Sequence, residues 1–396
     1  MSAPTRRLRV VQVSFHADAE RRDAESLLRA WPTLSAVAIA AASTGLDVSV
    51  VQAAHRPEVV EREGVAFHFV EGVGATRTRV IDCVASLEPD VVHVQGLGFP
   101  RQMRPLARAL PGVPLLAQDH GSVLPTGWRR WAWAWAHGCL AGVAFTAREQ
   151  SLAWKRAHIL RAGLPVFEVH EGSTDFTPGD RDTARSATGM FGNPCVLWTG
   201  RLDANKDPLT MLAAFEHAAV RMPDARLWCC FGDAPLLDVV TQRIASSPLL
   251  SSRVVLLGSR PHAELELRYR ATDVFVQTSH REGSGYSLIE AMACGATPLV
   301  TDIPASRKIV GDVGSLTPVG DAIALGDAII AWSARDQAAL RRVARARFED
   351  ALTVAVIGQS LRSAYDALAG PLDIARAHVA PENTTVRSPT IAGVTR

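Results

Sequence analysis

The chain has 396 residues, a length that predicts two or three domains. Hydrophobic residues make up 47% of it and charged residues 21%, which is ordinary globular usage and excludes a disordered, collagen-like or coiled-coil protein. The 42 Lys and Arg residues nearly balance the 40 Asp and Glu residues, so the net charge of +2 argues against a dedicated nucleic-acid binder.

Short β-branched runs alternate with longer Ala- and Leu-rich stretches of helical period, the pattern of parallel sheets with crossover helices. In the first half the predicted strands are 8–14, 47–53, 66–70, 91–95, 114–118 and 142–146, with an Ala-rich helix around 34–44. In the second half they are 195–199, 226–231, 254–257, 274–277 and 297–300. From about residue 321 to 368 the chain is predicted to be helical.

The polar stretch 171–193 is rich in turn formers and is predicted to link two α/β domains, 1–178 and 179–349. The expected fold class is α/β, with two Rossmann-like doubly wound domains facing each other across a cleft. In such sheets ligands bind beyond the carboxyl ends of the strands. Residues 373–396 carry little periodicity and are predicted to form a flexible tail.

The six cysteines lie scattered in apolar or helical surroundings, and none forms a C-x-x-C pair. They are expected to be reduced core thiols, which fits a cytoplasmic protein. The N-terminus turns polar within a few residues, and no apolar run approaches the ~18 residues of a spanning helix. Neither a signal peptide nor a membrane span is therefore predicted.

Two cations follow the first strand of the second half. That strand ends at Gly200, and Arg201 and Lys206 come before a helix that is predicted to begin near Pro208. Glycine lets a ligand approach the backbone, and a guanidinium together with an ammonium can hold a diphosphate without a metal. The alternative is a solvated loop with two surface cations. No D-x-D or His-rich spacing indicates a metal site.

A Gly-Ser-Gly loop at 283–285 precedes a helix that is predicted to start near Tyr286 or Ser287. The free N–H groups at such a helix start favour phosphate. Glu282 and Glu290 would repel a phosphate, so they are expected to accept hydrogen bonds from sugar hydroxyls on either side of it. The alternative is that both are solvated surface carboxylates.

A weaker motif, Gly258-Ser259-Arg260, follows the strand 254–257 and could line a flat base. On the acceptor side, His120 follows the strand 114–118 and is expected to face the cleft, unless it is hydrogen-bonded within its own turn. Asp119 beside it and His16 after the first strand are the further acceptor-side candidates.

Together these motifs resemble the retaining glycosyltransferases of family 4, the glycosyl transferases group 1. The resemblance covers nearly the whole chain and is strongest from 195 to 320. The stretches that carry it are HEGSTDFTPG at 170–179, GR at 200–201 with Lys206, FGD at 231–233, EGSGYSLIEAMACG at 282–295 and GD at 320–321.

The resemblance implies the two-domain GT-B architecture, with a final helix somewhere within 350–370 that packs back onto the first domain. It implies that Arg201 and Lys206 hold the donor diphosphate, that Glu282 contacts hydroxyls of the transferred sugar and that Glu290 binds the ribose. It also places His120 near the reacting carbon. The donor side expected on these grounds comprises Gly200, Arg201, Lys206, Arg260, Glu282, Gly283, Ser284, Gly285, Tyr286, Ser287 and Glu290.

The loop 14–22 departs from this pattern because related enzymes often carry a Gly-Gly pair there, and this chain has no glycine in it.

A second open point is the segment 128–135, where Trp128, Trp131 and Trp135 share one helical face. Packing into the core or against the other domain is the preferred interpretation. Peripheral contact with the inner face of a membrane is the alternative.

The predicted function is transfer of a sugar from a UDP-, GDP- or ADP-linked donor to a hydroxyl acceptor, with retention at the anomeric carbon. The expected catalytic residues are His120, Glu282, Arg201 and Lys206, and no metal or other cofactor is expected. The acceptor could be a carbohydrate, a lipid-linked molecule or a small molecule. A GT-B epimerase and a catalytically silent nucleotide-sugar-binding protein are the alternatives, whereas a nicotinamide-dependent oxidoreductase lacks its G-x-G-x-x-G motif after the first strand.

Overall fold

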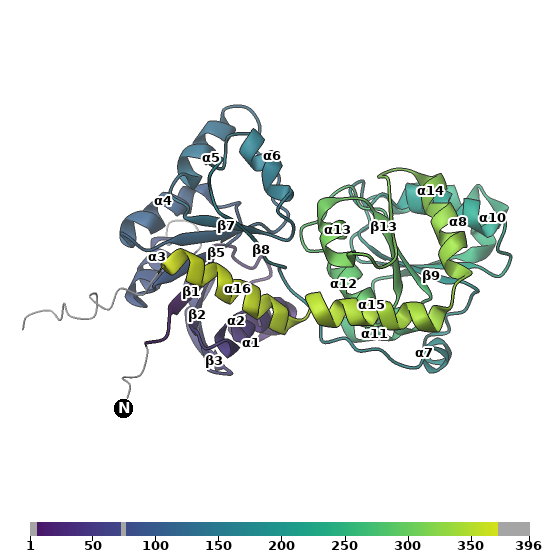
Figure 1. Ribbon diagram of the computed structural model, residues 1–396, viewed down its shortest axis with the longest axis horizontal. Coiled ribbons are helices and arrows are strands. Elements are labelled where there is room, and N and C mark those ends of the chain that lie inside the picture. The colour runs from purple at the N-terminus through teal and green to yellow at the C-terminus, as the bar shows by residue number, and fades with distance from the viewer. Residues whose placement is uncertain (1–5, 73–76, 371–396) are drawn as a thin grey trace, which may run out of the picture.

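The computed structural model describes residues 6–72 and 77–370, which form two α/β domains lying side by side (Figure 1). Each domain has one mainly parallel sheet covered by helices on both faces, so the predicted class is confirmed. The predicted tail 373–396 lies outside the described residues.

The N-terminal domain contains an eight-stranded sheet in the order β3-β4-β2-β1-β5-β6-β7-β8. All neighbouring strands in it run parallel except β3 and β4, which are antiparallel. The strand order reverses beside β1, and such a switch point opens a crevice at the carboxyl ends of the strands. The strands are β1 (Arg9–Ser14), β2 (Asp47–Ala54), β3 (Glu58–Arg62), β4 (Val65–Glu71), β5 (Val91–Gln95), β6 (Leu115–Gln118), β7 (Gly142–Phe145) and β8 (Val166–Glu168).

The strands of this sheet are apolar on both faces because a separate hydrophobic cluster packs against each face. In β1, Val11 and Val13 point into one hydrophobic cluster and Val10 into the other. The helices that cover the two faces are α1 (Ala24–Ala30), α2 (Pro32–Ser43), α3 (Arg77–Ser86), α4 (Pro100–Ala109), α5 (Arg129–His137) and α6 (Gln150–Arg156).

The C-terminal domain contains a six-stranded parallel sheet in the order β11-β10-β9-β12-β13-β14, with its switch point between β9 and β12. Its strands are β9 (Cys195–Gly200), β10 (Arg226–Phe231), β11 (Val254–Gly258), β12 (Val274–Gln277), β13 (Thr297–Thr301) and β14 (Ser315–Thr317). Its helices are α7 (Arg181–Thr188), α8 (Pro208–Ala219), α9 (Leu237–Ala245), α10 (Pro248–Arg253), α11 (His262–Ala271), α12 (Tyr286–Ala293), α13 (Pro304–Val310), α14 (Ala322–Ser333) and α15 (Gln337–Ala351).

A last helix, α16 (Val354–Ala369), leaves the C-terminal domain after α15 and lies against α2 of the N-terminal domain (Figure 1). The two helices approach closely at Gly358, which has no side chain. A Cβ atom there would lie 2.4 Å from the carbonyl oxygen of Ala40. Tyr365 is fully buried, and its hydroxyl lies 2.8 Å from Nδ1 of His93 and 3.2 Å from Nε2 of Gln12. This helix is thus part of the N-terminal core.

The structure adds elements that the pattern did not predict. The short strands β3, β8 and β14 were not expected, and the predicted linker 171–193 contains the helix α7. Asp180 caps the start of α7 by accepting from the N–H of Thr183, and Gly189 ends it in the left-handed conformation. Within residues 6–72 and 77–370, no helix combines the length and the hydropathy needed to cross a membrane.

Candidate active site

Two cavities meet at the carboxyl ends of the two sheets. The first has a volume of about 630 Å³ and is lined from both domains, by Asp119 and His120 on one side and by Arg201, Lys206 and Glu282 on the other. We call it the interdomain cavity. The second has a volume of about 580 Å³ and is lined by the N-terminal domain except for Tyr286, and we call it the N-terminal cavity. His120 lines both cavities and so stands where they join.

In the interdomain cavity, Lys206 and Glu282 form a partly buried ion pair. Nζ of Lys206 lies 2.5 Å from Oε1 of Glu282, and Nε2 of Gln277, at the end of β12, donates to the same oxygen at 3.0 Å. The two charged side chains are 17% and 10% exposed. The loop before α8 is fixed by a hydrogen bond from Thr278 Oγ1 to the carbonyl of Lys206. The ion pair therefore lies beyond the carboxyl ends of β9 and β12, the two strands between which the strand order reverses.

Arg201 is an exposed cation of this cavity. Its side chain is 59% exposed, and its Nε lies 3.0 Å from Oδ2 of Asp203. An exposed pair of this kind contributes little to stability, so the guanidinium can turn to an incoming anion at small cost.

The glycine loop 283–285 leads into α12, as expected. Gly285 has a φ of +63°, and no side-chain hydrogen bond caps the N-terminus of α12. Gly283 lies against the N-terminal domain, where a Cβ atom would be 2.6 Å from Oε1 of Glu171. Only glycine therefore permits the two domains to approach this closely at that point.

Glu290 is held by two residues of the neighbouring helix α11. The hydroxyl of Tyr269 donates to its Oε2 at 3.0 Å, and Nε2 of His262 lies 2.8 Å from its Oε1. The hydrogen bond to Glu290 is the main reason why the pKa of His262 is raised above its usual value. Neither cavity is lined by Glu290, nor by the further expected donor-side residues Gly200, Arg260, Ser284, Gly285 and Ser287.

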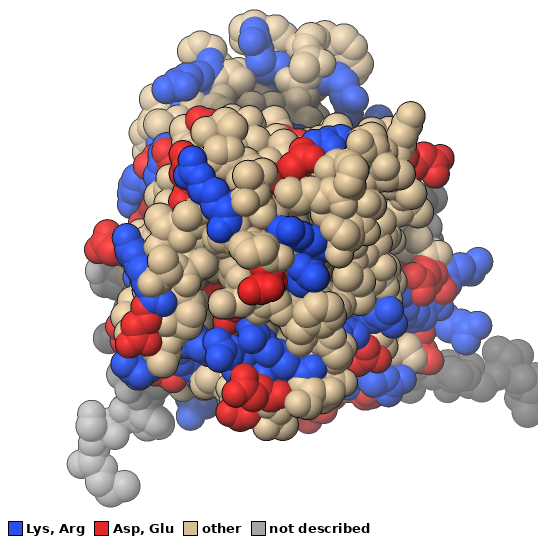
Figure 2. Space-filling model, turned by 90° about the vertical axis from the view of Figure 1, so that its right-hand side faces the viewer, with Lys and Arg blue, Asp and Glu red and all other residues tan. Residues whose placement is uncertain are grey.

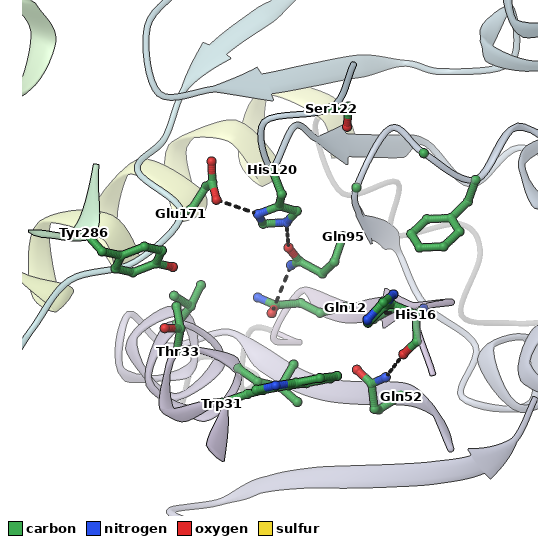
Figure 3. A pocket seen from close by; sticks show the side chains of 16 residues that line it. Gln12, His16, Trp31, Thr33, Gln52, Gln95, His120, Ser122, Glu171 and Tyr286 are labelled. Carbon is green, nitrogen blue, oxygen red and sulfur yellow. Dashed lines mark hydrogen bonds and ion pairs between the residues drawn. The ribbon is translucent and has the colours of Figure 1, made fainter. Parts of the chain in front are cut away.

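On the acceptor side, His120 is held between a carboxylate and an amide (Figure 3). Its Nδ1 lies 2.9 Å from Oε2 of Glu171, and its Nε2 lies 2.9 Å from Oε1 of Gln95. Ser284 of the C-terminal domain donates to the same Glu171 oxygen at 2.9 Å. Both partner atoms are oxygens that can accept a hydrogen bond, so the imidazolium form of His120 can donate to both at once.

The charges around His120 favour its protonated form. Desolvation lowers its pKa, but the hydrogen bond and charge of Glu171, together with the charge of Asp119, outweigh this and raise the pKa above 6.5. Burial in turn raises the pKa of Asp119. His120 can therefore present a positive charge to the junction of the two cavities.

Glu171 was missed as a site residue by the sequence analysis, although it belongs to the motif at 170–179. A usable signal exists, because His120 follows β6 and Glu171 follows β8. Since β6, β7 and β8 are parallel neighbours, their carboxyl ends meet at one edge of the sheet.

The N-terminal cavity is lined by amides and aromatic rings. Gln12, Gln52 and Gln95 line it together with the rings of His16 and Trp31, which are tilted by 36° with their centroids 5.7 Å apart (Figure 3). Glu171 is its one acidic lining residue, and neither lysine nor arginine lines it among the described residues. The glycine-free loop 14–22 brings the side chain of His16 into this cavity.

Comparison with known proteins finds a family match in the C-terminal half of the chain. Residues 193–334 match the family of glycosyl transferases group 1. The matched segment lies within the C-terminal domain and includes Arg201, Lys206, Glu282 and Glu290. Of the curated relatives, a GDP-mannose:cellobiosyl-diphosphopolyprenol alpha-mannosyltransferase of Xanthomonas oryzae is 24% identical over 249 residues, which are 59% of this chain and 61% of the relative. A D-inositol 3-phosphate glycosyltransferase of Mycobacterium sp. is 31% identical over 185 residues, 44% of this chain and 41% of the relative.

The chain thus spans about six-tenths or less of the curated relatives it matches. Solved structures are similar over almost the whole chain. Sucrose-phosphate synthase of Thermosynechococcus elongatus matches 91% of this chain and 99% of its own with a TM-score of 0.67 at 19% identity. Anabaena HepE in complex with UDP and glucose matches 91% of this chain and 100% of its own with a TM-score of 0.65 at 17% identity. These similarities show that the fold is the GT-B fold.

Proposed function

We propose that the protein transfers a sugar from a nucleoside-diphosphate donor to a hydroxyl acceptor with retention of the anomeric configuration. The observation that carries the proposal is the junction at His120 between two cavities of different chemistry. The interdomain cavity holds cations and the N-terminal cavity is lined by neutral amides and rings. A donor and an acceptor in these two cavities would meet beside His120.

We assign the donor diphosphate to Arg201, Lys206 and the uncapped N-terminus of α12. Positive charge and free N–H groups placed where the leaving diphosphate gains charge lower the barrier to its departure. An incoming diphosphate competes with Glu282 for Lys206, and the carboxylate of Glu282 is then free to accept from a hydroxyl of the sugar. HepE, a neighbour in fold, is described with UDP and glucose bound, which agrees with a donor of this class.

Retention requires in this proposal that the acceptor attacks the face from which the diphosphate departs, without a covalent enzyme intermediate. Of the described carboxylates that line the interdomain cavity, Glu282 is paired with Lys206 and Asp119 accepts from the N–H of Ser122. The third, Glu149, lies 4.0 Å from Arg307. Glu171 of the N-terminal cavity is engaged by His120 and Ser284. The bond from the anomeric carbon to the phosphate oxygen breaks while the bond to the acceptor oxygen forms on the same face. The acceptor proton passes to the departing phosphate oxygen.

We assign the acceptor to the N-terminal cavity and propose that it presents an uncharged, hydroxyl-rich group such as a saccharide. Amides donate to and accept from hydroxyls, and a flat ring such as Trp31 packs against the apolar face of a sugar. A phosphorylated acceptor is bound best by lysine or arginine, and the described lining of this cavity has neither. The name of the Xanthomonas relative gives it a cellobiosyl-bearing acceptor, which agrees with this assignment.

The first test is a thermal-shift panel of UDP-, GDP- and ADP-sugars, because a ligand that binds only the folded state raises the melting temperature. The donor found in this way is then incubated with a panel of saccharide acceptors, and the anomeric configuration of the product is read by NMR. Product of the donor's own configuration is expected. An inverted product, or conversion of the donor sugar into its epimer without any acceptor, contradicts the proposal.

We also propose a reducing, cytoplasmic setting. All six cysteines are free thiols, and four of them are buried.

A further inference from the structure

The tryptophan helix α5 does not pack as the sequence analysis preferred. Trp128, Trp131 and Trp135 are 78%, 64% and 59% exposed, so the prediction that they belong to the core or to a domain contact is wrong. The inward side of α5 is filled instead by Trp133, whose ring lies 6.1 Å from that of Trp154. The three exposed rings lie within one narrow face because residues i, i+3 and i+7 of a helix point the same way.

This face is also basic. Arg129 and Arg130 lie on α5, and Arg101, Arg104 and Arg108 lie on the adjacent helix α4. Residues 97–147 contain these five arginines and a single acidic residue, the buried Asp119. No ion pair between described residues involves any of the five.

The arginines and the tryptophans are interleaved. The guanidinium of Arg104 lies 4.2 Å from the ring centre of Trp135, and its Nε donates to the carbonyl of Trp135 at 2.7 Å. The guanidinium of Arg130 lies 5.3 Å from the ring centre of Trp131. We call this set of five arginines and three tryptophans the α4–α5 face.

Its position and its charge distinguish the α4–α5 face from the rest of the molecule. Figure 1 shows both helices on the side of the N-terminal domain that is turned away from the C-terminal domain. Figure 2 shows acidic and basic side chains mixed over the outer surface of the C-terminal domain. Single exposed apolar residues are normal, whereas a cluster of three large rings within an unbalanced basic surface marks an interaction site.

We propose that the α4–α5 face docks the protein on an anionic membrane surface. Indole rings settle at the level of the lipid head groups, because they combine an apolar body with one N–H donor. Arginines beside them are attracted to anionic head groups, so the two kinds of side chain act together. Helix α5 has nine residues and lies in the plane of the interface in this arrangement.

A second copy of the chain is a poor occupant of the same face. A twofold contact is self-complementary, and it would bring the five arginines of one copy against those of the other without an acidic partner. A bilayer with anionic lipids supplies the missing negative charge.

The docked orientation has a consequence for the acceptor. The loop 121–127 leads directly into the α4–α5 face, and Ser122 in this loop lines both cavities while Val123 is 66% exposed. This loop therefore connects the lining of both cavities with the surface that the membrane would cover. The docking itself does not depend on the proposed sugar transfer and can be tested without it.

The test is flotation of the full chain with phosphatidylcholine vesicles that do or do not contain 30% phosphatidylglycerol. Binding to the anionic vesicles is expected, and it should weaken as NaCl is raised because salt screens the arginines. The variant Trp128→Ser/Trp131→Ser/Trp135→Ser should bind at least about tenfold less, and so should Arg129→Gln/Arg130→Gln. The second variant changes only surface charge, so it keeps the test valid if the first does not fold.

A matched control lies on the C-terminal domain, where Val220 is 73% exposed and the side chain of Arg221 is 65% exposed. The variant Val220→Ser/Arg221→Gln should bind as the unchanged protein does. The proposal is overturned if the unchanged protein stays at the bottom of the gradient, if neutral vesicles bind it equally well, or if the control loses as much binding. It is also overturned if light scattering shows a dimer that the tryptophan substitutions dissociate.

Discussion

Oε2 of Glu171 lies 2.9 Å from Nδ1 of His120, and this contact joins residues that are 51 positions apart in the chain. Because the carboxylate raises the pKa of His120, Glu171→Gln should lower that pKa. An NMR titration of the His120 ring in the two proteins measures the shift. The variant Glu149→Gln removes an exposed carboxylate that also lines the interdomain cavity and should leave the titration unchanged. An unchanged His120 pKa in Glu171→Gln would contradict the assignment.

The same contact predicts how stability varies with pH. Since the folded state holds the pKa of His120 above its ordinary value of 6.5, protonation of His120 stabilises the fold. This contribution is complete below pH 6.5 and is lost as the pH rises through the folded-state value. The melting temperature of His120→Asn should therefore fall furthest below that of the unchanged protein at about pH 6, and the gap should shrink by about pH 9. A gap that widens with pH would show that His120 is held neutral.

Arg201 should be needed for turnover but not for folding. Arg201→Ala removes a charge-assisted contact to the leaving diphosphate, and we expect transfer to slow by about 30- to 1000-fold, or ~2–4 kcal/mol. The exposed Arg221, in the turn after α8, provides the control, because Arg221→Ala should leave the rate unchanged. Turnover of Arg201→Ala within a few-fold of the unchanged enzyme would remove Arg201 from the donor site.

Trp31 should affect the acceptor and not the donor. Trp31→Ala takes away the flat surface of the N-terminal cavity, so the KM for a saccharide acceptor should rise about tenfold or more. The donor-induced thermal shift should not change, and Trp31→Phe should restore part of the acceptor affinity. Steady-state kinetics with each substrate varied in turn separates these effects, and a rise in the donor KM alone would contradict the assignment.

Gly283 should tolerate no side chain. The Cβ atom of Gly283→Ala would lie 2.6 Å from Oε1 of Glu171 and 3.0 Å from the backbone nitrogen of Gly121, so the domains should move apart. We expect a larger radius of gyration by X-ray scattering and a strong loss of activity. Gly232→Ala meets no atom within 4 Å and is the control. Equal compactness of the two variants would mean that the loop gives way locally.

Tyr365 should contribute to the stability of the N-terminal domain through its hydroxyl. Tyr365→Phe removes the hydroxyl 2.8 Å from Nδ1 of the buried His93 and leaves this atom only the long contact to Gln95 at 3.5 Å, a loss of about 1–3 kcal/mol. Burial lowers the pKa of His93 to about 3, so the ring cannot escape the loss by becoming charged at neutral pH. Chemical denaturation measures the effect against Ser363→Ala, which changes an exposed hydroxyl on the same helix. Equal stabilities would show that water replaces the tyrosine hydroxyl.

The two sheets could be predicted from the sequence because their central strands are continuous apolar runs. Val91–Gln95 and Val274–Gln277 end where the pattern placed them. The short edge strands β3, β8 and β14 carry few apolar residues or only three positions, and a pattern cannot separate them from loops.

The lining of the interdomain cavity was predictable where its residues directly follow strands that the pattern identified. Arg201, Lys206 and Glu282 line one cavity as expected. Glu171 was not predicted as a site residue, because only the order of the strands brings it next to His120. The tryptophans of α5 were misplaced for a related reason, since helical spacing shows that three rings share a face but not which way that face turns.

Helix α16 also bears on how the protein is made. Its residues Ile357, Leu361 and Tyr365 fill the same cluster as Val10 on the first strand. During synthesis this first strand leaves the ribosome long before its final packing partner is translated, so the N-terminal half must wait, partly assembled, while the C-terminal sheet folds. Nascent chains halted before residue 354 should therefore depend on chaperones far more than chains halted after residue 370.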